Sequence, residues 1–136
     1  MRQNINDYLH TQSVHDWLLT GISISGEDTL EISVSDPSNK DWGKFVFHNV
    51  KSCKFDNFHP GNIILDVVVS TGTNIETVID ESMCYIFDID SGKLTAAWCD
   101  TLKKDIYAQK LLLVNFSTSY GVYGAIICQS IEYKYL

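Results

Sequence analysis

The sequence predicts an α+β fold made mainly of antiparallel sheet, with six or seven strands arranged as a sandwich or an open barrel. Long parts of the chain alternate apolar and polar residues, which is the pattern of half-buried strands. Three other parts carry apolar residues three and four positions apart, which indicates a short N-terminal helix and one or two helices before the last hairpin. The length of 136 residues and the 45 % hydrophobic composition suit a single globular domain over residues 1–136.

A short N-terminal helix is predicted between Asn4 and Leu19, where apolar residues recur at helical spacing. The period then changes to two, both at residues 22–24 and at residues 30–34. Residues 26–29 between these stretches have good turn chemistry, so we expect a β-hairpin there.

Three further strands are predicted in the middle of the chain. Alternating patterns at residues 45–47 and 51–55 indicate two half-buried strands. The Pro60-Gly61 pair suits the centre of a type II turn, so the next strand should begin at Asn62. That strand carries apolar residues on both faces, which is typical of a central strand.

One or two helices are predicted before the last hairpin. Apolar residues at helical spacing run from Ile75 to Ile86, and Ser91-Gly92 ends this segment. A second helix is predicted from Leu94 to Tyr107, although residues 94–96 would also suit the start of a strand.

The last hairpin is predicted from the C-terminal third of the chain. Residues 111–116 form a strongly apolar stretch, and Tyr120-Gly121 suits a turn. A single final strand is then expected from Val122 to Tyr133, which takes the sheet almost to the end of the chain.

The net charge and the lack of long apolar segments limit which partners the chain is expected to bind. Seventeen acidic and 10 basic residues give a formal net charge of −7, which is the wrong sign for binding nucleic acid. The first twenty residues do not resemble a signal peptide, and no apolar run approaches the roughly 18 residues of a membrane span. We therefore expect a cytoplasmic protein without membrane contact, whose four separated cysteines are free thiols.

Residues 74–92 contain five acidic residues and no basic residue. They form either a solvated helix face or a docking surface for a basic protein partner. The tyrosines of the TSYGVYG stretch either cover a sheet edge or act as exposed interface anchors. If the acidic residues form a docking surface and the tyrosines are interface anchors, the predicted partner-binding residues are Glu76, Asp80, Glu81, Asp88, Asp90, Tyr120 and Tyr123.

No motif in the sequence defines a catalytic site. His15-Asp16 resembles the ligand pair of metal-dependent phosphohydrolases, but the other histidines lack the required spacing. No cysteine or serine stands in a nucleophile motif, and no glycine-rich phosphate-binding loop is present. We therefore predict no enzymatic activity, no cofactor and no metal site, with a His/Asp metal-dependent hydrolase as the weakest alternative.

Four segments of the chain, taken in order, carry a resemblance to a known protein family. They are SVHDWLLTGISIS, GKFVFHNVKSCKF, NFHPGNIILDVVV and NFSTSYGVYGAIICQSIEY. This arrangement resembles a family of small bacterial proteins, some of which are immunity proteins of polymorphic toxin systems. The resemblance covers most of the chain outside residues 72–110 and assigns no catalytic residue. The matching positions are His15, Asp16, Asn62, Ser119, Tyr120 and Gly121.

The resemblance implies a protein that neutralises a cognate toxin by stoichiometric binding. Toxins that attack nucleic acid tend to be basic, so an acidic protein is the expected counterpart. The alternative is a β-rich module that binds a small ligand in an apolar pocket lined by Trp17, Trp42 or Trp98.

Overall fold

A computed structural model describes residues 2–4, 16–36, 41–58, 61–70 and 76–135. Its strands are β1 (Arg2–Asn4), β2 (Leu18–Ser25), β3 (Thr29–Asp36), β4 (Asp41–His48), β5 (Ser52–Asp56), β6 (Asn62–Ser70), β7 (Leu112–Tyr120), β8 (Tyr123–Cys128) and β9 (Ser130–Tyr135). Between β6 and β7 lie α2 (Glu76–Phe87), the 3₁₀ helix η1 (Ser91–Thr95) and α3 (Ala97–Tyr107). The antiparallel sheet and the helices inserted before the last hairpin confirm the predicted α+β class.

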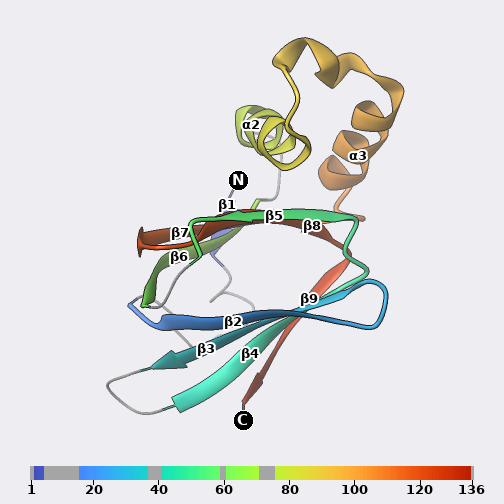
Figure 1. Ribbon diagram of the computed structural model, residues 1–136. Helices are drawn as coiled ribbons and strands as arrows, with labels where there is room; N and C mark the ends of the chain where they lie inside the picture. The colour runs from blue at the N-terminus through green and yellow to red at the C-terminus, as the bar shows by residue number, and fades with distance from the viewer. Residues whose placement is uncertain (1, 5–15, 37–40, 59–60, 71–75, 136) are drawn as a thin grey trace.

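The described strands form one sheet in the order β5-β8-β7-β6-β2-β3-β4-β9, and β1 pairs with the end of β6. Only two residue pairs, Leu18 with Ile63 and Leu19 with Asn62, join β2 to β6. The sheet folds over at this short junction, so that β5 to β8 form one layer and β2, β3, β4 and β9 form a second (Figure 1). The helices lie against the outer face of the first layer (Figure 1).

The predicted single strand from Val122 to Tyr133 is wrong, because it is two strands separated by Gln129. β8 pairs with β5 and β7 in the first layer, whereas β9 pairs with β4 in the second. At the corner, the backbone N–H of Gln129 donates a hydrogen bond to the carbonyl of His48 at 3.0 Å. This change of layer raises the number of described strands above the predicted six or seven.

The ends of the predicted N-terminal helix also differ from the prediction. Asn4 belongs to β1, and Leu18 and Leu19 belong to β2, where they pair with β6 and β3. The rest of that predicted helix, residues 5–15, lies outside the described residues. Pairing with the central strand β6 therefore decides the conformation at both ends of this segment.

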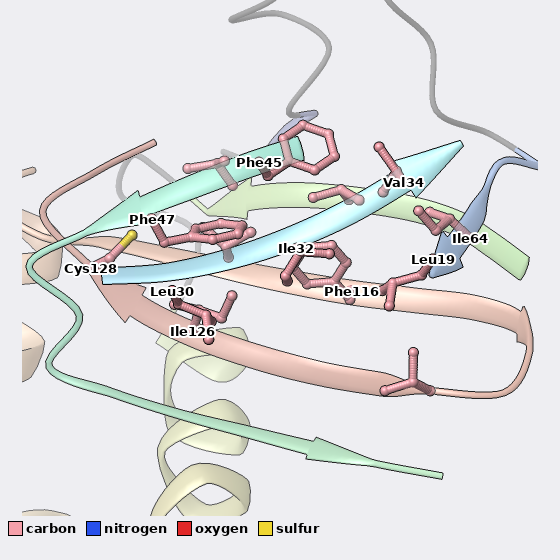
Figure 2. Packing of buried hydrophobic residues seen from close by; sticks show 14 of the residues in the cluster. Leu19, Leu30, Ile32, Val34, Phe45, Phe47, Ile64, Phe116, Ile126 and Cys128 are labelled. Atoms are coloured by element: carbon pink, nitrogen blue, oxygen red, sulfur yellow. The ribbon is translucent and has the colours of Figure 1, made fainter. Parts of the chain in front are cut away.

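The larger hydrophobic core lies between the two layers of the sheet. Figure 2 shows the side chains of β3 and β4 meeting those of β6, β7 and β8. The residues labelled there are Leu19, Leu30, Ile32, Val34, Phe45, Phe47, Ile64, Phe116, Ile126 and Cys128. Their alternation along each strand is the period-two pattern of the sequence.

A second hydrophobic cluster lies between the first layer and the helices. Ala125 and Ile127 of β8 belong to it, whereas Ile126 between them belongs to the larger core. On the helix side, Ile79, Met83, Ile86, Cys99 and Ile106 contribute buried side chains. β7 and β8 are thus buried on both faces, and α2 packs over β8 and the edge strand β5.

We expect the buried thiol of Cys128 to make the native protein less stable at alkaline pH. Burial raises the pKa of this thiol to about 12, so the native state disfavours the thiolate. The stabilisation by the protonated Cys128 thiol is complete below the pKa that the thiol has in the unfolded chain. It is lost as the pH rises from there towards the pKa of the thiol in the native protein. Between pH 8 and 10, urea unfolding should show wild type losing about 1 kcal/mol more than Cys128→Ala, which removes the sulfur and cannot ionise. Equal losses in both proteins would contradict this.

Candidate functional site

A groove of about 300 Å³ lies between α2 and the strands β7 and β8. We call it the α2–β8 groove. Its lining residues are Glu81, Ser82, Tyr85, Asn115, Phe116, Tyr123 and Gly124. Two residues predicted to contact a partner, Glu81 and Tyr123, come together here although they lie far apart in the sequence. This groove is the candidate functional site.

The burial pattern of α2 decides which of its acidic residues reach the groove. Ile79, Met83 and Ile86 face the sheet, so Glu81 and Tyr85, one turn apart, lie along one flank of the helix. Asp80 is the neighbour of Glu81 but points about 100° away around the helix axis. Its Oδ1 atom forms an ion pair with Nζ of Lys103 on α3 at 2.7 Å. Asp80 therefore links α2 to α3 and does not line the groove.

Tyr85 connects the groove to the edge strand β5. Its hydroxyl donates a hydrogen bond to Asp56 Oδ2 at 2.6 Å. The Nζ atom of Lys54 lies 4.7 Å from the centroid of the Tyr85 ring, and the ring of Tyr123 lies 5.9 Å away at an angle of 37°. Burial and then the hydrogen bond to Asp56 raise the pKa of Tyr85 well above its usual range, which keeps its hydroxyl a donor. Tyr85 is thereby held in one orientation beside Tyr123.

A polar pair joins the two walls of the groove, Asn115 on β7 and Ser82 on α2. Asn115 of β7 donates a hydrogen bond from Nδ2 to Ser82 Oγ at 3.1 Å. The Oδ1 atom of Asn115 is buried and has no hydrogen-bond partner among the described residues. A buried acceptor without a donor is unfavourable, so a ligand N–H group that reaches this atom when the Asn115 side chain turns toward the groove would be stabilised.

The other predicted partner-binding residues lie away from the groove. Glu76 is exposed in the first turn of α2, and Asp88 and Asp90 are exposed after its last turn. Tyr120 pairs with Ile63 at the end of β7, and its side chain lies outside the described residues. The acidic block is therefore spread along and around the helix instead of forming one surface.

Two residues of the family resemblance, Asn62 and Gly121, form a buried structural contact. The N–H of Val122 donates to Asn62 Oδ1 at 2.9 Å, and Asn62 Nδ2 donates to the carbonyl of Leu19 at 3.4 Å. Gly121 has a φ of 99°, and a Cβ atom there would lie 2.3 Å from Asn62 Oδ1. Asn62 thus ties β2 and β6 to the turn between β7 and β8.

Among the remaining residues of the resemblance, Asp16 is the one whose side chain the structure describes. Asp16 is exposed with a φ of 65°, and its N–H donates to the carbonyl of Ile64 at 2.8 Å. His15 and the side chain of Ser119 lie outside the described residues. In the described part of the chain, no three His, Cys, Asp or Glu residues are grouped so that they could hold a metal ion.

The three tryptophans lie in separate places. Trp17 is buried in the larger core, Trp42 is exposed on β4, and Trp98 is exposed on α3 with its ring 4.8 Å from that of Phe87. None of them lines the α2–β8 groove. Neither α2 nor α3, the helices of the described residues, is long and apolar enough to cross a lipid bilayer.

Sequence analysis did not identify Tyr85, Asp56 or Asn115 as site residues. The four-residue spacing of Glu81 and Tyr85 on a predicted helix was the one local signal for Tyr85. Asp56 and Asn115 reach the site through sheet pairing and helix packing, which have no local signature. No protein-family model matches this chain, and neither a curated protein nor a solved structure matches it.

Proposed function

We propose that this chain is a non-enzymatic binding protein that forms a stoichiometric complex with a basic protein through the α2–β8 groove. The observation that carries the proposal is the meeting of two tyrosine rings, Tyr85 and Tyr123, with the carboxylate of Glu81 in one groove. In this proposal the chain is an immunity protein that neutralises a toxin. The family resemblance supports this role.

Charge favours a basic partner. The chain carries a net charge of −7, and the groove-lining residues include one carboxylate and no lysine or arginine. Opposite charge on a partner speeds the encounter and disfavours acidic competitors. The complex should therefore weaken as the salt concentration rises.

The tyrosines favour a protein interface. Tyrosine provides a large contact area with little loss of side-chain entropy, and tyrosines are common among the residues that dominate binding energy. Tyr85 is already oriented by its hydrogen bond to Asp56, and Tyr123 is 45 % exposed. Little further ordering of the Tyr85 ring is needed when a partner binds.

The test uses the product of the gene immediately upstream of the gene for this chain, which we expect to be the toxin. Its C-terminal domain, co-purified with this protein, should give a 1:1 complex whose affinity falls between about 0.1 and 0.5 M salt. Calorimetry should show an affinity loss of about 30-fold for Tyr85→Ala, because this change removes a central aromatic anchor.

The matched control is Tyr107→Ala on α3, because Tyr107 is an exposed tyrosine outside the groove. Its affinity for the toxin candidate should equal that of wild type. An upstream product that neither inhibits growth nor binds this chain would contradict the immunity role. Equal affinity losses for both tyrosine variants would contradict the assignment of the groove.

A further inference from the structure

We infer that the α2–β8 groove binds an arginine side chain of the partner, with its guanidinium against the Tyr85 and Tyr123 rings. The guanidinium donates hydrogen bonds to the carboxylate of Glu81 and to Oδ1 of Asn115. This inference rests on the proposed function and specifies the group that the groove recognises.

The groove is suited to a cation. The ammonium of Lys54, 4.7 Å from the ring centroid of Tyr85, places a positive charge at cation–π distance from this ring in the free protein. The residues lining the groove include the exposed carboxylate of Glu81, for which the described residues provide no ion pair, and no basic side chain. Lys54 does not line the groove, so a second cation there would meet one carboxylate and two aromatic rings, while the charge of Lys54 opposes its binding.

The positions of the acceptors favour arginine over lysine. Glu81 belongs to α2 and Asn115 to β7, so the two acceptors lie on opposite walls of the groove. A guanidinium presents five donors in one plane and stacks on aromatic rings, whereas an ammonium is a compact, strongly hydrated charge. One arginine can donate to both walls while its flat face contacts a tyrosine. It also supplies the N–H group that the buried Oδ1 of Asn115 lacks.

Three short peptides test this inference on the full chain. Acetyl-Gly-Arg-Gly-amide, its lysine counterpart and its neutral citrulline counterpart differ in one side chain. In an NMR titration, the arginine peptide should shift the side-chain amide resonances of Asn115 and the backbone resonances around Tyr85. The lysine peptide should bind about tenfold more weakly, and the citrulline peptide should cause no shift at the same concentration.

A pair of matched variants locates the site on α2. Glu81→Gln keeps the size of the side chain but removes its charge, and should weaken the arginine peptide about tenfold. Glu76→Gln makes the same change on an exposed residue of α2 outside the groove, and should leave the affinity unchanged. Lysine binding as tightly as arginine, or no effect of Glu81→Gln, would overturn the inference.

Different results would overturn the inference of arginine binding and the proposed function. A salt-sensitive complex that Tyr85→Ala weakens, combined with peptides that are not discriminated, would overturn arginine recognition alone. An arginine peptide that binds as described, without any complex with the basic protein, would overturn the proposed function alone. Free arginine binding as tightly as the peptide would assign the groove to a small molecule and would also overturn the inference.

Discussion

Replacing Phe47 with alanine is expected to lower the free energy of unfolding by about 4 kcal/mol. Phe47 of β4 is completely buried, and its ring lies 6.0 Å from that of Phe116 in the opposite layer (Figure 2). Removing the ring leaves a cavity between two layers that are each held by strand pairing and cannot close around it. A loss of this size is a large part of the stability of an ordinary domain of this length.

Urea unfolding followed by circular dichroism measures the change. Phe58→Ala is the control, because Phe58 is 50 % exposed, and it should change the stability by about 0.5 kcal/mol or less. If the alanine variant of Phe47 does not fold, Phe47→Leu keeps most of the volume and should lose about 1 kcal/mol. Similar losses at Phe47 and Phe58 would show that the two layers do not enclose the core as described.

The strands were predictable where apolar and polar residues alternate along the chain, because successive side chains point to opposite faces of the sheet. Residues 30–34 and 45–47 carry that alternation, and β3 and β4 include them. The sequence does not separate β8 from β9, because Gln129 and Ser130, between the apolar stretch that ends at Cys128 and Ile131, include no glycine or proline that would signal a turn. The corner at Gln129 depends on a hydrogen bond to His48, a residue of another strand, and the local sequence does not encode it.

The candidate site was predictable only in part. Helical spacing predicted α2, and its acidic residues were visible in the sequence, but the face that each one occupies depends on packing. Asp80 and Glu81 are adjacent and chemically alike, yet Lys103 of α3 binds the first and the groove contains the second. Asn115 looked like an ordinary polar residue of a strand, and only the position of α2 above β7 brings it beside Ser82.

Gly121→Ala is the second change with a large expected effect, a loss of about 3 kcal/mol of stability. Gly121 has a φ of 99°, which an L side chain adopts only with strain. The added Cβ would also lie 2.3 Å from Asn62 Oδ1 and 3.0 Å from Asn62 Cα. Asn62 would have to move away and leave the buried N–H of Val122 without its acceptor.

Gly26→Ala separates the two causes. Gly26 has a φ of 73° in the turn between β2 and β3, but no atom lies within 4 Å of an added Cβ. This variant suffers the backbone strain without the clash, so it should lose about 1 kcal/mol. Equal losses for Gly26→Ala and Gly121→Ala in urea unfolding would assign the whole effect to the backbone and none to Asn62.

A double-mutant cycle with Asn62→Ala tests the contact itself. Asn62→Ala alone should lose about 2 kcal/mol, because the buried N–H of Val122 loses its acceptor. Once Asn62 is alanine, Gly121→Ala no longer displaces a side chain. The loss of unfolding free energy in the double variant should therefore be about 1 kcal/mol smaller than the sum of the two single losses. Strict additivity would contradict the contact. Because this contact holds the turn that leads into Tyr123, we expect its loss to disturb the groove as well.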